Sequence, residues 1–204
     1  ELLNNKNQLE ELKKDMLNTL GKASANPTEA STDIELIKAE YAQFGIKRNN
    51  LVLELNNLQQ EHDLISPWGK IDWSCIDWIE QAGYDVAFYS TTSLSEDEQR
   101  MFNLVEVGES GTRRLFLAVN PKETLVDLTA EKILLPHKDV DELFNAIETQ
   151  KAKIKALDDE KKAYAVAHIQ EVSRALAHLQ DSINLEQVKL NTGAEADAHV
   201  CLLE

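Results

Sequence analysis

Apolar residues recur at helical spacing over most of this chain, and the spacing changes only in its middle part. The first stripe covers residues 1–20 and ends at Gly21, where a stretch rich in Ala, Ser, Asn and Pro begins. A second stripe starts after Thr32 and Asp33, either of which can cap a helix. Its positions alternate spacings of four and three: Ile37, Tyr41, Phe44, Arg48, Leu51, Leu55, Leu58, His62 and Ile65. This is the heptad pattern of a coiled coil with two polar interruptions.

The heptad segment is long for a small globular domain. At 1.5 Å per residue, a helix over residues 33–64 would be roughly 48 Å long, so its partner must be comparably long. Residues 138–188 offer such a partner, with apolar positions at Leu143, Ile147, Ile154, Leu157, Ile169, Val172, Leu176, Leu179 and Ile183. Between Leu157 and Ile169 the spacing advances in successive steps of four, a stutter that locally unwinds a left-handed supercoil. We expect an antiparallel hairpin of two coiled-coil helices with a local irregularity.

The middle of the chain has short apolar runs that are rich in β-forming residues, and they begin after Pro67 and Gly69. The expected helices are 73–82, ended by Gly83, then 95–101, and one from Pro121 to about Thr129; the expected strands are 84–89, 103–107, 113–119 and 132–135. Residues 109–112 should turn the second and third strands into a hairpin. The middle of the chain is therefore predicted to form a small α/β lobe.

The predicted fold class is α+β and mostly α: a long antiparallel helical coiled-coil hairpin that carries a small α/β lobe at its tip. The expected segments are an N-terminal helix and loop near the proximal end (1–32), an outgoing coiled-coil helix (33–66), a distal lobe (67–136), a returning coiled-coil helix (137–192) and the start of a proximal-lobe strand (193–204). Because the chain opens inside a helical pattern and ends on what reads as a strand, we expect a piece of a longer protein.

Charge and composition narrow the range of partners. The chain has 36 acidic and 21 basic residues and a formal net charge of -15. Phosphate binding needs clustered Lys and Arg, so we expect no nucleic-acid partner, whereas a basic protein surface suits this charge. No apolar run is long enough to span a membrane, no signal peptide is recognisable, and we expect no membrane contact by these residues. Cys75 and Cys201 lack CxxC spacing, which favours a reducing compartment.

The motifs of common catalytic and cofactor sites are missing from the sequence. The 5 histidines show no HxxxH or HExxH spacing, and neither a GxxxxGK[ST] nor a GxGxxG loop is present. A GxSxG elbow is also missing, and Cys75 stands among isoleucines, where we expect it to be buried as a small apolar residue. No pair of carboxylates is assigned to a cleft. We therefore predict no catalytic, cofactor-binding or metal-binding residues and no enzymatic activity.

All tryptophans of the chain, Trp68, Trp73 and Trp78, stand at the junction of the long heptad segment with the lobe. Large aromatic residues bury much surface wherever they pack. Two interpretations stay open: the tryptophans pack the lobe onto the coiled coil, or they form a hot spot for a partner.

The triplet Pro67-Trp68-Gly69, followed by Ile71-Asp72, stands after a long heptad helix and before a small α/β lobe. In this it resembles the cytosolic N-terminal half of subunit I (subunit a) of V-type and archaeal-type rotary ATPases, which are ion-transporting complexes. The resemblance covers about residues 33–204 in organisation, and residues 191–204 stand where that family enters its second lobe.

The resemblance implies a stator role at the cytoplasmic face of the cell membrane. In that family the cytosolic half is held by the peripheral stalk, a pair of helical subunits, and resists the torque of rotation. Its near lobe lies by the rest of the stator and the base of the central stalk, while ion (proton) transport belongs to the membrane half. The expected stalk contact is the surface of the 67–136 lobe, including Trp68, Trp73 and Phe88 where they are exposed.

Two other functions compete with the stator role. One is a free-standing coiled-coil tether or adaptor, in which the heptads pair between chains. The single globular insertion between two stripes of similar length favours pairing within one chain. The other is an enzyme acting through the lobe, which needs a concave pocket with converging polar groups.

Overall fold

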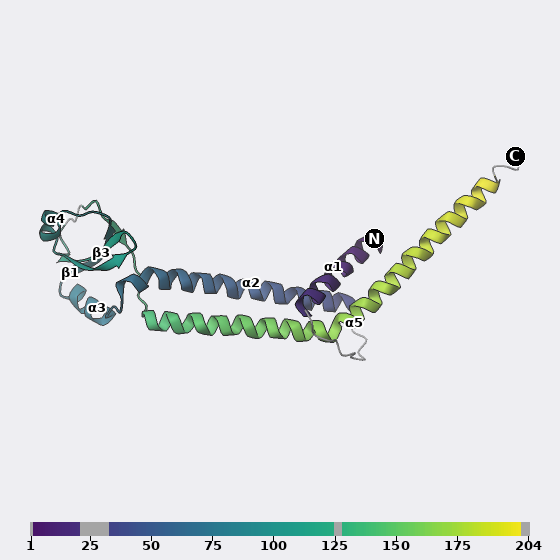
Figure 1. Ribbon diagram of the computed structural model, residues 1–204, viewed down its shortest axis with the longest axis horizontal. Coiled ribbons are helices and arrows are strands. Elements are labelled where there is room, and N and C mark those ends of the chain that lie inside the picture. The colour runs from purple at the N-terminus through teal and green to yellow at the C-terminus, as the bar shows by residue number, and fades with distance from the viewer. Residues whose placement is uncertain (1, 21–32, 125–127, 201–204) are drawn as a thin grey trace. The chain divides into compact units, whose positions relative to one another are not determined.

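The computed structural model describes residues 2–20, 33–124 and 128–200, with side chains up to residue 190. The described chain is mostly helical and contains a small antiparallel sheet (Figure 1). The helices are α1 (Leu2–Leu20), α2 (Ile34–Ile65), the 3₁₀ helix η1 (Ser66–Trp68), α3 (Trp73–Gln81), α4 (Glu96–Met101) and α5 (Val140–Val200). The strands are β1 (Tyr84–Thr91), β2 (Leu104–Ser110), β3 (Arg113–Pro121) and β4 (Glu131–Ile133).

The contacts divide the chain into two compact units. The first unit comprises residues 1–50 and 153–204, and the second comprises residues 51–152. Helices α2 and α5 each contribute to both units, so the division falls inside these helices.

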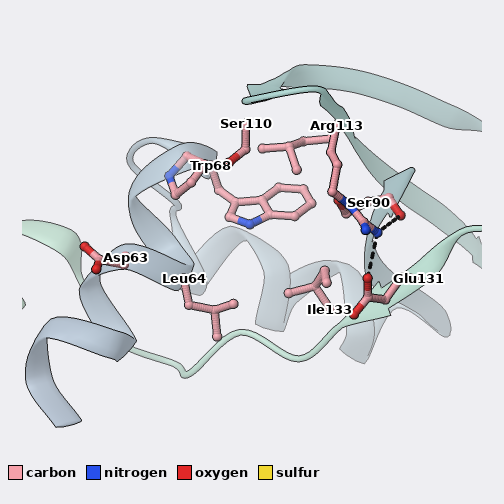
Figure 2. A pocket seen from close by; sticks show the side chains of 10 residues that line it. Asp63, Leu64, Trp68, Ser90, Ser110, Arg113, Glu131 and Ile133 are labelled. Carbon is pink, nitrogen blue, oxygen red and sulfur yellow. Dashed lines mark hydrogen bonds and ion pairs between the residues drawn. The ribbon is translucent and has the colours of Figure 1, made fainter. Parts of the chain in front are cut away.

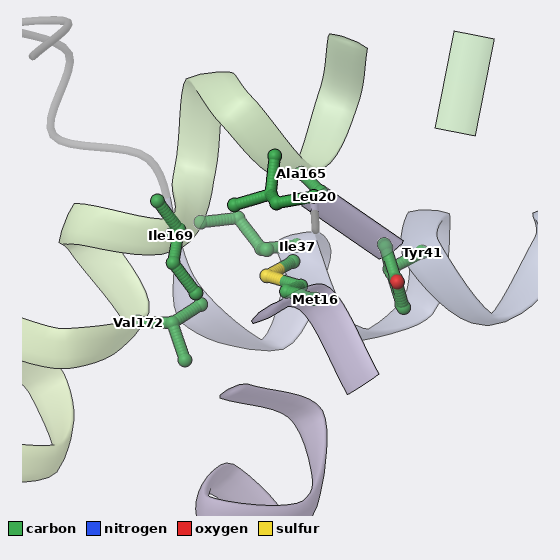
Figure 3. Packing of buried hydrophobic residues seen from close by; sticks show 7 residues of the cluster. All are labelled: Met16, Leu20, Ile37, Tyr41, Ala165, Ile169 and Val172. Atoms are coloured by element: carbon green, nitrogen blue, oxygen red, sulfur yellow. The ribbon is translucent and has the colours of Figure 1, made fainter. Parts of the chain in front are cut away.

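The first unit is built around a core that three helices share. Its buried side chains come from α1, the first half of α2 and the middle of α5, and Figure 3 shows them converging: Met16, Leu20, Ile37, Tyr41, Ala165, Ile169 and Val172. Two polar contacts join the same helices at the edge of the core. The hydroxyls of Thr19 and Tyr41 lie 2.9 Å apart, and the Lys161 ammonium lies 3.0 Å from the Asp15 carboxylate. Helix α1 is thereby fixed against both long helices.

Within the first unit, α2 and α5 make contacts in antiparallel order. The Tyr164 hydroxyl donates to Glu40 Oε2 at 2.8 Å, and Arg48 Nε donates to Asp158 Oδ1 at 2.8 Å. The ring of Phe44 lies 5.6 Å from that of Tyr164. As residue numbers increase along α2, the numbers of the residues that they contact on α5 decrease, so the two helices are antiparallel within this unit.

The same order holds within the second unit. The Gln150 amide donates to the Leu51 carbonyl at 3.1 Å and to the Glu54 carboxylate at 2.6 Å, and the ring of Phe144 lies 6.5 Å from that of His62. Gln150 is only 3% exposed and occupies the apolar stripe between Ile147 and Ile154. A buried amide in the stripe is a feature that the apolar periodicity did not predict.

The lobe contains a four-stranded sheet in the order β2-β3-β1-β4, in which every neighbouring pair is antiparallel. Strands β2 and β3 form the hairpin expected from the sequence, since Ser110 pairs with Arg113 and Gly111 turns the chain with φ 63°. Helix α3 ends before Gly83, whose φ of 94° suits only glycine without strain. The hairpin and the end of α3 confirm the sequence predictions for this part of the lobe.

The sheet is apolar on both faces. One face carries a buried cluster of Ala87, Tyr89, Leu104, Phe116 and Ala118. Side chains at the ends of α4 and around residues 128–130 pack against this cluster. The other face carries Val86 and Phe88 of β1 beside Val119 and Leu117 of β3, and helix α3 lies over it. The apolar run from Val86 to Tyr89 in the middle of β1 fits a strand that is covered on both faces.

Two predicted elements are wrong in the described part of the chain. Lys122 and Glu123 form a turn where a helix from Pro121 to Thr129 was expected, and residues 128–130 are not helical; residues 125–127 lie outside the described residues. Pro121 is the last residue of β3, and the Lys122 N–H donates to the Gly83 carbonyl, so the chain is held at the sheet. The strand expected at 193–204 is helical up to Val200, and residues 201–204 lie outside the description. The alanines after Gly193 are strong helix formers, which explains the longer α5.

No helix among the described residues has the length and apolar character that crossing a bilayer requires.

Candidate partner-binding site

The triplet Pro67-Trp68-Gly69, on which the resemblance rests, joins α2 to the lobe. Pro67 lies in the first turn of η1, where its missing N–H costs no hydrogen bond. Gly69 follows with φ 71° and ψ -153°, a conformation that side-chain-bearing residues rarely adopt, and its N–H donates to the Ser66 carbonyl at 3.1 Å. The local backbone thus explains both Pro67 and Gly69. Trp68 between them is directed onto the sheet.

Trp68 packs against Phe88, a buried residue of β1. The two rings meet edge to face with their centroids 5.0 Å apart, which is a favoured geometry for aromatic pairs. The centroid of the Trp73 ring lies 6.2 Å from that of the same Phe88 ring. Phe88 therefore joins the end of α2 to the start of α3.

Trp73 also contacts the segment that precedes α5. Its indole N–H donates to the Lys138 carbonyl at 2.8 Å, and its ring meets the His137 imidazole edge to face at 4.5 Å. An ion pair of Lys138 with Glu61 of α2 lies beside this contact. The start of the returning helix is thereby connected to the lobe and to the outgoing helix within the second unit.

The three residues predicted for partner binding are thus brought together, and their main contacts are within the chain. Phe88 is 9% exposed, while Trp68 and Trp73 are half-buried. Their packing fits the first of the two interpretations of the tryptophans, and a partner contact through the exposed parts of Trp68 and Trp73 stays a prediction. Trp78, one turn further along α3, is 70% exposed and is the tryptophan that presents most of its ring to solvent.

A cavity of ≈ 260 Å³ opens beside Trp68 (Figure 2). Its polar wall is a network on three strands: Arg113 Nε donates to Ser90 Oγ at 2.8 Å, and its Nη2 donates to the Ser90 carbonyl at 3.0 Å and to Glu131 Oε2 at 2.6 Å. Ser90 and Glu131 are register partners on β1 and β4. The sequence did not predict this network, because its members come together only through the strand register.

A second cavity, of ≈ 250 Å³, lies between α3 and the sheet. Ile76 and Ile79 line it from the helix, and Val86 and Leu117 line it from the strands. Cys75 reaches its edge but is exposed, so the expectation that this thiol is buried is wrong. Ile76 and Ile79 of α3 face the sheet, so Cys75, the residue before Ile76, lies near the solvent.

Three carboxylates of the lobe are stabilised in their ionised form, and all have structural roles: the hydrogen bonds from Ser95 lower the pKa of Glu98 in the capping box of α4. The hydrogen bond from Arg114 lowers the pKa of Glu106 across the β2/β3 pair. The Ser74 hydroxyl and the Cys75 N–H lower the pKa of Asp72, which caps the N-terminus of α3. These contacts fix local structure and do not form an acid–base pair.

The first unit has a polar cluster that sequence periodicity did not indicate. Burial and the hydrogen bond to Glu40 raise the pKa of Tyr164. The Tyr164 ring lies 4.3 Å from the His168 imidazole, and His168 Nδ1 lies 2.8 Å from Glu171 Oε2. Among the described residues, Glu171 Oε1 is buried without a hydrogen-bond partner. No group of three or more His, Cys, Asp or Glu in that described part is arranged to hold a metal ion.

The chain was compared with models of protein families, with curated proteins and with solved structures, and none of the three comparisons gave a match.

Proposed function

We propose that this chain is a non-catalytic stator scaffold: the cytosolic arm of the membrane subunit of a V-type or archaeal-type rotary ATPase or ATP synthase. The observation that supports it best is the joint at Pro67-Trp68-Gly69. This triplet ends a long helix and begins a small lobe, and each of its residues has a structural reason there. The resemblance named above rests on the same triplet in the same order of elements.

In this proposal α2 and α5 form one antiparallel coiled-coil hairpin that carries the lobe. Heptad positions of both long helices are buried within each unit: Ile37, Tyr41, Ile169 and Val172 in the first, in one cluster with Met16 and Leu20 of α1, and Leu143 and Ile147 in the second. Burial inside one chain disfavours the alternative of a free-standing tether, whose heptads pair between chains. An antiparallel pair of helices resists bending through side-chain packing along its length, which is what a torque-bearing element needs.

The partner in this proposal is the pair of peripheral-stalk subunits, which binds the exposed surface of the lobe. The other end of the arm meets the rest of the stator near the base of the central stalk, on the cytoplasmic face of the cell membrane. The net charge of -15 favours a basic partner surface. Trp78 and the half-buried Trp68 and Trp73 supply aromatic surface of the kind that is enriched in interfaces.

Two measurements test the proposal. Small-angle X-ray scattering with light scattering should give an elongated monomer with a helical arm of roughly 48 Å or more; a compact globule contradicts the hairpin, and an elongated dimer favours the tether. Isothermal titration with the peripheral-stalk pair of the source organism should give saturable binding at one site. A chain that does not bind this pair contradicts the stator role.

A further inference from the structure

The cavity beside Trp68 has three chemically different walls, all within the second unit. The Trp68 indole forms one wall, Leu64 and Ile133 form an apolar floor, and the Arg113–Ser90–Glu131 network forms the third (Figure 2). Its volume of ≈ 260 Å³ is below the range of about 300–1,000 Å³ typical of pockets for whole small molecules. A space of this size suits one long side chain.

We propose that this cavity binds the cationic side chain of a lysine or arginine presented by a partner protein. This inference rests on the proposed stator function and names the chemistry by which the lobe recognises the peripheral stalk. The aliphatic stem of the guest lies on Leu64 and Ile133, its charged end lies against the Trp68 indole, and Glu131 accepts its hydrogen bond.

The polar wall contains a carboxylate oxygen that can accept a hydrogen bond from the guest. Arg113 donates hydrogen bonds through Nε and Nη2, and its contact with Glu131 uses only Oε2 of that carboxylate. The second oxygen of Glu131 has no hydrogen-bond partner among the described residues, and the side chain is 62% exposed. Ser90 is buried and holds the guanidinium in place, so the wall is arranged before a guest arrives.

The charges around the cavity favour a cation over an anion. Asp63 also lines the cavity, but its side chain is 83% exposed and its carboxylate lies 3.5 Å from His62 Nδ1, so Glu131 is the carboxylate that a guest meets inside. An aromatic face attracts cations and not anions, and an indole does so best among side chains. The net charge of -15 adds a long-range field of the same sign. An anionic guest would have to compete with Glu131 for Arg113.

The first test uses a single side chain as the probe. The full chain is titrated with N-acetyl-lysine methylamide, and the indole N–H signals of the three tryptophans are followed by NMR. The Trp68 signal should move in a saturable way, while N-acetyl-norleucine methylamide, which has the same four-carbon chain without the ammonium group, should leave it in place. Equal shifts with both probes, or no shift with either, overturn the proposal.

Variants separate the site from the general charge of the chain. Glu131→Gln keeps an acceptor for Arg113 but removes the charge, and it should weaken lysine-analogue binding about five-fold, equivalent to about 1 kcal/mol. Glu123→Gln removes one charge from an exposed turn that does not line the cavity and should have no effect. Trp68→Phe keeps the packing against Phe88 with a weaker aromatic face and should also weaken binding. Circular dichroism checks that each variant folds, and equal losses in the variants at 123 and 131 contradict a local site.

The peripheral-stalk pair supplies the second arm of the test. If the pair binds the chain and Glu131→Gln does not weaken that binding, the stator function stands and the cavity is not its basic-residue site. If the lysine analogue binds at Trp68 and the pair does not bind, the cavity recognises a cation and the proposed stator function is wrong.

Discussion

Truncation of Ile37 to alanine tests the three-helix core of the first unit. Ile37 has 0% exposure and lies among Met16 of α1 and Val172 of α5, which are also fully buried. Its neighbour Leu36 points out of the core and is 48% exposed. Ile37→Ala and Leu36→Ala therefore form a matched pair at adjacent positions of one helix.

The size of the effect follows from the carbon atoms removed. Ile→Ala deletes three carbons, each worth about 0.8 kcal/mol of transfer free energy, which gives about 2.4 kcal/mol. The cavity that remains adds to this loss, and measured Ile→Ala changes in cores span about 2–5 kcal/mol. We expect Ile37→Ala to lower the free energy of unfolding by about 3 kcal/mol and Leu36→Ala to lower it by under about 0.5 kcal/mol.

Urea unfolding followed by far-UV circular dichroism measures both changes, because the described chain is mostly helical. With an m-value of about 3 kcal/mol per molar urea, the midpoint for Ile37→Ala should fall by roughly 1 M. Intrinsic fluorescence reports the second unit separately, since Trp68, Trp73 and Trp78 all lie there. Equal losses for Ile37→Ala and Leu36→Ala would refute the packing of α1 and α5 around Ile37.

Three further predictions follow from single contacts. Gly69→Ala should destabilise the lobe by about 1–3 kcal/mol in thermal unfolding, because Gly69 has φ 71°, whereas Gly45→Ala in the exposed middle of α2 should stabilise by about 1 kcal/mol. Arg114 lowers the pKa of Glu106, so this pair contributes stability above about pH 4.3. That stability is lost as the pH falls through the lower folded-state pKa of Glu106. In unfolding measured against pH, the free energy of unfolding of Glu106→Gln should therefore fall less steeply toward acid than that of the parent chain. Burial and Glu40 raise the pKa of Tyr164, so Tyr164→Phe should remove the highest step from an absorbance titration of tyrosinate. A variant that behaves as the parent chain in its own assay contradicts the corresponding contact.

Much of the helical part was predictable because burial follows periodicity. The heptad positions Ile37, Tyr41 and Ile65 of α2 are buried, and so are Leu143 and Val172 of α5. An apolar stripe on a helix must be buried against another element, but the stripe itself does not show which element that is. For that reason the sequence predicted the long helices but not that α1 inserts Met16 between them.

The errors concern segments where local preference and tertiary contacts compete. Proline is common at helix starts. Here, however, the pairing of β3 with β1 extends to Pro121, and the N–H of Lys122 donates to the Gly83 carbonyl. Gln150 breaks the apolar stripe of α5 and is buried all the same, because Leu51 and Glu54 accept its amide N–H groups. Hydrogen bonds of this kind depend on the partner helix and leave no trace in the periodicity of one segment.

The sequence named Trp68, Trp73 and Phe88 as partner contacts but did not predict how they are arranged. Crowded tryptophans at a joint indicate a contact, and Trp68, Trp73 and Phe88 do form one cluster. Whether such a cluster faces a partner or its own chain depends on the register of β1, which buries Phe88. The wall of Arg113 and Glu131 depends on the same register, so no spacing along the sequence could reveal it.

The stator role is tested most directly in the parent complex. The rotary ATPase is purified from membranes of the source organism through an affinity tag on a peripheral-stalk subunit, and its subunits are identified and quantified by mass spectrometry. Peptides from this chain should be present in fixed proportion to the stalk pair and should stay with the complex through size-exclusion chromatography. A purified, active ATPase whose membrane subunit lacks this sequence would contradict the stator assignment.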